Sequence, residues 1–188
     1  MIRLQKKVAH GEMSILETER LILQPFRDTD LAQLAELFAN RDFMRFSLGP
    51  YTREQTAAFL DTIIGWQRAG LPSLFATELK REHPLLGYCG FFHHPPEVTN
   101  DVEIGYRLHP GYWNRGLITE AARAVRDHAF RDLKLARVIS LVHPDNIPSR
   151  RVAEKIGMAV TKEIMFRGFS TLVFAIEREQ WLAQHAAA

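Results

Sequence analysis

Residues 102–122 set the strongest limit on how this chain can fold. They read VEIGYRLHPGYWNRGLITEAA, and the first seven alternate apolar and polar side chains as a β-strand does. Pro110 ends that pattern, because proline has no backbone N–H to donate to a neighbouring strand. The segment LITEAARAVRDHAF, which begins at Leu117, then places its apolar residues at helical spacing. The sequence therefore predicts a strand, a tight loop and a helix in direct succession.

The loop between this strand and this helix is suited to binding an anion. Gly116 directly precedes the helix, whose first N–H groups have no partner within the helix and point outward. These donors and the helix dipole favour negative charge, and Arg115 adds a cation beside them. We interpret the loop as a pyrophosphate cradle. The alternative is an ordinary strand–loop–helix connection, because neither GxGxxG nor GxxxxGK[ST] is present.

Composition narrows the class of protein. The chain has 188 residues, of which 46% are hydrophobic and 24% charged, values typical of a single globular domain. Its formal net charge of +2 is too small to indicate binding to nucleic acid. No apolar run approaches the length of a membrane span, so no membrane partner is expected. The single cysteine, Cys89, excludes an internal disulfide and fits a reducing compartment, which predicts a cytoplasmic protein.

The order of predicted elements gives the fold class. Strands are expected at residues 20–26, 74–79, 85–92, 102–108, 138–142, 160–166 and 171–176. Helices are expected after Asp28 or Thr29, after a capping box of Thr52 and Gln55, from Leu117, and over residues 147–156. This order predicts an α/β (α+β) fold, a mixed sheet with helices on its faces and one β-α-β crossover. Ligands of such sheets bind where strands part at their carboxyl ends, here between residues 102–108 and 138–142. We expect one domain over residues 16–182, with tails at residues 1–15 and 183–188.

Three segments, together with this order of elements, resemble the GNAT superfamily of acyl-CoA-dependent N-acetyltransferases. The segments are ETERLILQPF at residues 17–26, EIGYRLHPGYWNRGLITEA at 103–121 and HPDNIPSRRVAEKIGM at 143–158. They are most similar to the RimJ/RimL-type branch, which acetylates the N-termini of ribosomal proteins. The resemblance implies a GNAT fold, with a mixed, mostly antiparallel central sheet of about seven strands and helices on both faces. One splayed parallel pair of strands would form the acyl-CoA site.

The resemblance implies acetyl-CoA as the cosubstrate and no metal. Backbone N–H groups of one loop would hold the pyrophosphate, and the residues of that loop are Asn114, Arg115, Gly116, Leu117, Ile118 and Thr119. The backbones of Ile104, Tyr106 and Leu108 would pair with the pantetheine arm at a bulge in their strand. The family pattern Q/R-x-x-G-x-G/A has Trp113, Gly116 and Ile118 at its three marked positions, so only the central glycine matches.

Further cofactor contacts are implied at the helix over residues 147–156. Asn146 would contact the CoA arm, and Ser149 would donate a hydrogen bond to the departing thiolate. Arg115, Arg150 and Arg151 suit the CoA phosphates, because a guanidinium binds phosphate through two parallel hydrogen bonds. The alternative for the arginines is a solvated charge on a helix face. For Asn146 and Ser149 it is a helix N-terminus, where both residue types are favoured.

Acetyl transfer to an amine also requires a base, because the amine arrives protonated. Glu103 is the candidate general base, although alternation places its side chain on the opposite face from Ile104 and Tyr106. Ala153 stands where many family members have a tyrosine that protonates the thiolate, which leaves that role to Ser149. Phe46 and Tyr51 are candidates for the acceptor pocket. The spacing of histidines and Cys89 suggests no metal site.

The sequence thus predicts an N-acetyltransferase in which a primary amine attacks acetyl-CoA directly in a ternary complex. The amine would belong to a protein N-terminus or to a small molecule, and the protein would be a monomer or a homodimer. Two other classes stay open. One is a non-catalytic acyl-CoA-binding or regulatory module on the same fold. The other is a simple nucleotide-binding α/β domain, which would bind ATP in preference to CoA.

Overall fold

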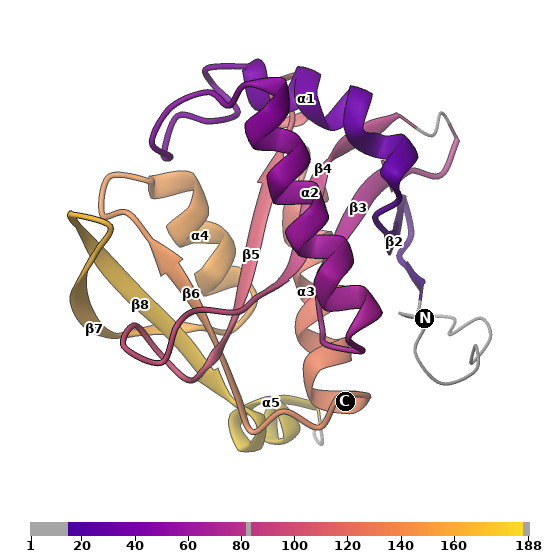
Figure 1. The fold of residues 1–188 in the computed structure, drawn as a ribbon. Helices are drawn as coiled ribbons and strands as arrows, with labels where there is room; N and C mark the ends of the chain where they lie inside the picture. Colours follow the sequence, from indigo (N-terminus) through magenta and orange to yellow (C-terminus); the bar gives the residue numbers. More distant parts are fainter. Residues whose placement is uncertain (1–14, 82–83, 186–188) are drawn as a thin grey trace.

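A computed structural model describes residues 15–81 and 84–185. A sheet of eight strands runs through the molecule in the order β1-β2-β3-β4-β5-β6-β8-β7 (Figure 1). The strands are β1 (Leu16–Glu17), β2 (Leu21–Pro25), β3 (Leu74–Leu79), β4 (Leu85–Phe92), β5 (Val102–Leu108), β6 (Arg137–Val142), β7 (Ala159–Phe166) and β8 (Phe169–Glu177). The helices are α1 (Leu31–Ala39), α2 (Arg53–Arg68), α3 (Leu117–Arg131), α4 (Ile147–Lys155) and α5 (Arg178–His185), with short 3-10 helices at Asp28–Asp30 and Pro110–Tyr112.

One pair of neighbouring strands is parallel, and it parts almost at once. β5 and β6 pair at Val102–Val138 and Glu103–Ile139, and their backbone pairing ends after Glu103–Ile139. β5 then continues to Leu108 and β6 to Val142, so the two strands separate toward their carboxyl ends. A parallel connection needs a crossover, and α3 provides it. The predicted mixed, mostly antiparallel sheet with one splayed parallel pair is confirmed.

Helices cover both faces of the sheet. Figure 1 shows α1 and α2 crossing in front of it, with α3 behind. The core on the α3 side includes Phe91 of β4 and Phe130 of α3, which are fully buried. The core on the other side gathers side chains of α1 and α2, such as Phe38 and Ile63, against Leu74 of β3. Burying one such side chain stabilises the fold by about 1.5–3 kcal/mol. Strands β3 and β4 contribute side chains to both cores, and the apolar side chains of β5 belong to the core on the α3 side.

Local sequence signals explain where several helices begin. The predicted capping box at α2 is present: Thr52 Oγ1 accepts from the Gln55 N–H at 3.2 Å, and Gln55 Oε1 accepts from the Thr52 N–H at 2.8 Å. Asn146 caps α4 by accepting from the Ser149 N–H at 3.2 Å. α3 instead begins directly after Gly116, whose φ of +76° lies in the left-handed region that favours glycine.

Two elements differ from the sequence prediction. The sheet has eight strands rather than about seven, because Leu16 and Glu17 pair with β2 in a strand too short to show alternation. A helix that the sequence analysis did not predict, α5, extends to His185 and so includes residues 183–185 of the expected C-terminal tail. Trp181 explains this helix: it is buried, and its Nε1–H donates to Asp127 Oδ1 at 2.8 Å. Residues 1–14 of the expected N-terminal tail lie outside the described residues.

Candidate active site

The site is centred on the gap between the parting strands β5 and β6. At the narrow end of this gap, two hydrogen bonds that each involve a side chain link β6 to β5. Ser140 Oγ donates to the Ile104 carbonyl oxygen at 2.7 Å, and the Leu141 N–H donates to Glu103 Oε1 at 3.3 Å. The Ile104 carbonyl therefore points toward β6. Because backbone groups of alternate residues point the same way in a strand, those of Tyr106 face the open gap.

The predicted bulge in this strand is wrong. The pairing of β5 with β4 is continuous from Leu108–Gly87 to Glu103–Phe92. The backbone of β5 faces open space because β6 diverges, and no extra residue is inserted. The carbonyl of Leu108, one of the three predicted pantetheine partners, accepts a hydrogen bond from Trp113 Nε1 at 2.7 Å.

Glu103 lies on the face of β5 that α1 and α2 cover. Its side chain is only 12% exposed, and its second carboxylate oxygen, Oε2, lies 2.5 Å from His94 Nε2. Arg107, four residues later on the same face, donates to the Phe43 carbonyl at 2.9 Å and so ties the α1–α2 connector to β5. Ile104 and Tyr106 pack into the core on the other face, with α3. The alternation expected from the sequence is present, and it sets Glu103 on the connector side of the gap.

On the opposite face, two hydroxyl groups meet at the start of α4. Tyr106 Oη donates to the Ser149 carbonyl at 2.9 Å, and Ser149 Oγ donates to Tyr106 Oη at 3.3 Å. Burial raises the pKa of Tyr106, and the hydrogen bond with Ser149 lowers it by less, so the phenol stays protonated at neutral pH. The sequence prediction used only the backbone of Tyr106. Its hydroxyl contact joins residues far apart in the chain, and no local pattern signals it.

The loop at residues 114–119 presents backbone donors rather than side chains. Asn114 and Gly116 both have left-handed backbones, with φ of +60° and +76°. The Glu120 N–H bonds to the Gly116 carbonyl at 3.0 Å, which leaves the N–H groups of residues 117–119 without a partner in the helix. The side chains of Leu117 and Thr119 are buried, and Ile118 packs against the core. The bulk of Ile118 is therefore accommodated inside the protein.

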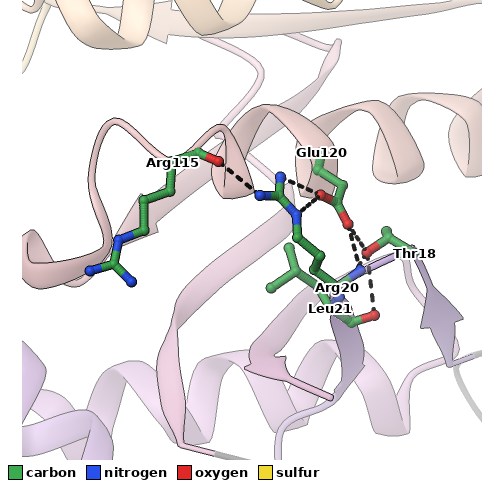
Figure 2. A network of polar contacts seen from close by, with 5 residues as sticks. All are labelled: Thr18, Arg20, Leu21, Arg115 and Glu120. Carbon is green, nitrogen blue, oxygen red and sulfur yellow. Dashed lines mark hydrogen bonds and ion pairs between the residues drawn. The ribbon is translucent and has the colours of Figure 1, made fainter. Parts of the chain in front are cut away.

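A network of polar contacts fastens this loop to the start of β2 (Figure 2). Arg20 donates from Nη1 to the Arg115 carbonyl at 3.0 Å and from Nε to Glu120 Oε2 at 2.7 Å. Glu120 Oε1 accepts from the Arg20 N–H at 2.9 Å and from Thr18 Oγ1 at 2.5 Å. Partial burial raises the pKa of Glu120, but the hydrogen bonds from Thr18 and Arg20 and the Arg20 charge lower it by more. The Glu120 carboxylate therefore stays ionised at pH values where ordinary glutamates take up a proton.

Two of the three predicted phosphate-binding cations are exposed. The guanidinium of Arg115 lies 5.2 Å from the centre of the Tyr112 ring, and both Arg115 and Arg151 are exposed. Arg150 is half-buried and donates to the Pro144 carbonyl at 3.2 Å. Exposure leaves Arg115, just before α3, and Arg151, in α4, accessible to an anion.

The structure separates the two predicted acceptor residues. Phe46 is 39% exposed, and its ring centre lies 5.8 Å from that of His143. Tyr51 instead packs edge-on against Phe38 and lines an open hollow of about 440 Å³ beside α2, which Glu103 does not line. His143 also approaches the ring of Phe169, 6.2 Å away, so three chain segments meet at this aromatic group. The sequence prediction missed His143 and Phe169, because only the fold brings them beside Phe46.

Cys89, a side chain that could act as a nucleophile, belongs to the hydrophobic core. Cys89 is completely buried, and burial raises the pKa of its thiol, so it is not an activated nucleophile. Within residues 15–81 and 84–185, no group of three or more His, Cys, Asp or Glu side chains could hold a metal ion. In the same described part of the chain, no helix combines the length and apolar character needed to cross a membrane.

Comparison with known proteins identifies the family. A family model described as "Acetyltransferase (GNAT) domain" matches residues 20–159. The chain is 31% identical to the uncharacterized N-acetyltransferase YnaD of Bacillus subtilis, over 88% of this chain and 98% of that protein. A GNAT-family acetyltransferase structure from Bacillus anthracis is 30% identical with a TM-score of 0.75, covering 88% of this chain and 99% of the other.

A more distant structure shows the same fold. RimL, a ribosomal L7/L12 α-N-protein acetyltransferase solved with coenzyme A, is 18% identical with a TM-score of 0.74, over 87% of this chain and 98% of its own. At that identity, the likeness concerns the fold alone. The family match and the near relatives extend over most of the chain. The chain therefore belongs to the GNAT acetyltransferase family, and it is an N-acetyltransferase of that family.

Proposed function

We propose that this enzyme transfers the acetyl group of acetyl-CoA to a primary amine by direct attack in a ternary complex. One observation carries the proposal: Glu103 and the Tyr106–Ser149 hydroxyl pair lie on opposite faces of β5, beside the gap where β5 and β6 part. A thioester held in that gap would have a base on the side of the entering amine. It would have a hydrogen-bond donor on the side of the leaving thiolate.

The cofactor is proposed to lie on the α3–α4 side of the sheet. Backbone N–H groups of residues 116–119, with Arg115 and Arg151, would hold the phosphates. The backbone of Tyr106 would pair with the pantetheine arm as an added strand does, together with that of Ile104 beside it. Asn146 would contact the same arm from the start of α4. The left-handed loop, the orphan donors at α3 and the exposed guanidinium groups support this arrangement.

The chemistry assigns one role to each side of β5. Glu103 takes a proton from the ammonium group of the acceptor, and the amine nitrogen then bonds to the thioester carbonyl carbon. When the carbon–sulfur bond breaks, the electron pair leaves with sulfur, and Ser149 Oγ–H donates a hydrogen bond to the thiolate. The second proton that the nitrogen loses on becoming an amide passes to this thiolate, which leaves as the CoA thiol. Polarisation of the carbonyl by a β5 backbone N–H would lower the barrier in the manner of an oxyanion hole.

The acceptor is proposed to be a protein N-terminal amine or the amine of a small molecule. The resemblance of residues 103–121 and 143–158 to the RimJ/RimL-type branch supports a protein N-terminus. Phe46, beside His143 and Phe169, would line the approach to Glu103 from the connector side. Cytoplasmic location is part of the same proposal, since a single cysteine suits a reducing compartment.

A thermal-shift titration with an amine screen tests this function. Acetyl-CoA at about 100 times its Kd is expected to raise the Tm by about 5–10 °C, because a ligand that binds only the folded state stabilises it. ATP is expected to cause no shift. Release of CoA thiol should then depend on an added amine, with a free-N-terminus peptide, spermidine and benzylamine as probes. No shift with acetyl-CoA would contradict the proposal.

A non-catalytic acyl-CoA-binding module is the second candidate, and one observation favours it. Ala153, fully buried on α4, occupies the position where many family members have a tyrosine. A thermal shift with acetyl-CoA but no thiol release with any probe amine would support this module over an active transferase.

The contacts that hold the loop at residues 114–119 predict that loss of the Arg20 side chain weakens cofactor binding selectively. In Arg20→Ala, the Arg115 carbonyl and the Glu120 carboxylate lose their arginine donor, so the loop is less preorganised. The KM for acetyl-CoA is expected to rise about fivefold, equivalent to about 1 kcal/mol, while the KM for the amine stays the same. Arg27→Ala is the matched control, because Arg27 pairs with Asp30 at the start of α1. An unchanged KM for acetyl-CoA in Arg20→Ala would exclude this role.

A further inference from the structure

We infer that His94 is a positioning residue for this reaction, which holds the carboxylate of Glu103 in place for proton transfer. The inference rests on the proposed function, because it assigns His94 a role through the proposed base. His94 follows β4, and β4 pairs with β5 so that Phe92 lies opposite Glu103. This register brings His94, two residues beyond the end of β4, beside the start of β5.

The contact between the two side chains is short and buried. His94 Nε2 lies 2.5 Å from Glu103 Oε2, and the two side chains are 8% and 12% exposed. An ionised carboxylate can only accept hydrogen bonds, so Nε2 carries the proton in this contact. The Leu141 N–H donates to the other oxygen, Oε1. Each carboxylate oxygen therefore has one fixed donor and one lone pair left to receive a proton.

Two donors from different elements determine the orientation of the carboxylate. Leu141 belongs to β6 and His94 to the segment after β4, so Glu103 is held from both sides of β5. With only the Leu141 donor, which is the longer contact at 3.3 Å, the carboxyl group could rotate about its last side-chain bond. A base displaced by about 1 Å from the amine can lose about 100-fold in rate.

The imidazole ring is itself held in position. The ring of Phe166, at the end of β7, packs edge-on against His94 with ring centres 5.3 Å apart. The Phe166 ring is in turn contacted by the Arg167 guanidinium, which lies 5.1 Å from the ring centre. The Phe166 contact limits rotation of the imidazole, so Nε2 stays directed at Glu103. The β7–β8 hairpin thus supports the base through two aromatic rings.

The neighbouring His93 provides a matched contrast. Its Nε2 lies 2.7 Å from the Pro72 carbonyl, and its ring packs against Trp66, 5.1 Å away. Both histidines therefore have one polar and one aromatic partner, but only His94 contacts the proposed base. Replacing each in turn separates loss of a histidine in this segment from loss of the Glu103 contact.

Steady-state kinetics of five variants test the inference, with acetyl-CoA and the best probe amine from the screen above. His94→Ala is expected to lower kcat by about 10- to 100-fold with little change in either KM. His94→Gln is expected to keep kcat within about threefold of wild type, because a glutamine amide N–H can replace the Nε2–H donor. His93→Ala should leave kcat unchanged. In the Glu103→Gln background, His94→Ala should cause no further loss, because His94 acts only through Glu103.

Contrary results would exclude either hydrogen-bond donation by His94 or its action through Glu103. A wild-type kcat in His94→Ala, or equal losses in His94→Gln and His94→Ala, would exclude positioning by hydrogen-bond donation. A full additional loss in the Glu103→Gln/His94→Ala double variant would show that His94 acts independently of Glu103. Either of these outcomes, with an active wild type and an impaired Glu103→Gln, leaves the proposed function intact. No turnover by wild type with any probe amine overturns the proposed function, and the role of His94 with it.

Discussion

Glu103→Gln is expected to lower kcat for amine acetylation by about 100- to 1,000-fold at neutral pH, because the amide cannot take the ammonium proton. Glutamine has nearly the size of glutamate, and its carbonyl oxygen can still accept a hydrogen bond at this position. The thermal shift caused by acetyl-CoA should therefore be the same in the variant and wild type. This separates loss of the base from loss of the cofactor site.

The pH dependence of the variant provides a second measurement. An α-amino group has a pKa of about 8, so above that pH the acceptor arrives mostly deprotonated and needs no base. The rate of Glu103→Gln should then rise with pH and approach that of wild type. A kcat within about threefold of wild type at pH 7 would exclude Glu103 as the base. A deficit that persists unchanged at pH 9 would assign Glu103 a role other than proton removal.

Gly87→Ala is expected to have the largest effect on stability, about 3 kcal/mol, because β5 leaves no room for a side chain there. A Cβ atom at Gly87 would lie 2.1 Å from the Arg107 carbonyl oxygen and 2.9 Å from its carbonyl carbon. These are backbone atoms of the paired strand, so relief requires a shift of β4 against β5. The φ of Gly87, +152°, adds strain for any other residue. The Tm should fall by about 6–12 °C.

Gly65→Ala is the matched control for this substitution. Gly65 lies in α2, and a Cβ atom there would meet no atom within 4 Å. Alanine should stabilise the helix by about 0.5–1 kcal/mol, because glycine loses more backbone entropy on folding. Differential scanning calorimetry measures both changes. A Tm for Gly87→Ala within 2 °C of wild type, as a rough threshold, would mean that the two strands can separate at little cost.

Local patterns were sufficient to predict most of the sheet. The strands expected at residues 85–92 and 102–108 coincide with β4 and β5, and the capping box placed the start of α2 correctly. Alternation in β5 also gave the correct face for Glu103. These features depend on residues close together in the chain, where side-chain periodicity and capping determine the conformation.

Features that depend on distant residues could not be predicted from one sequence. α5 forms because Trp181 packs into the core against Phe130 of α3 and donates to Asp127, contacts that exist only once the core is assembled. The parting of β5 from β6 was expected from the family resemblance, but the exposure of the β5 backbone was attributed to a bulge, which the continuous register of β5 with β4 contradicts. The contacts of Glu103 with His94 and of Tyr106 with Ser149 depend on strand register and on the position of α4.

The contact between Arg20 and the loop before α3 means that this loop is not a self-contained motif. Its carbonyl at Arg115 and its first-turn carboxylate at Glu120 are held by a residue about a hundred positions earlier in the chain. Residues 114–119 grafted onto another sheet would carry the orphan N–H groups of a helix start, but not the arginine that fixes the carbonyl behind them. A transplant of the phosphate site therefore requires the Arg20–Glu120 pair to move with the loop.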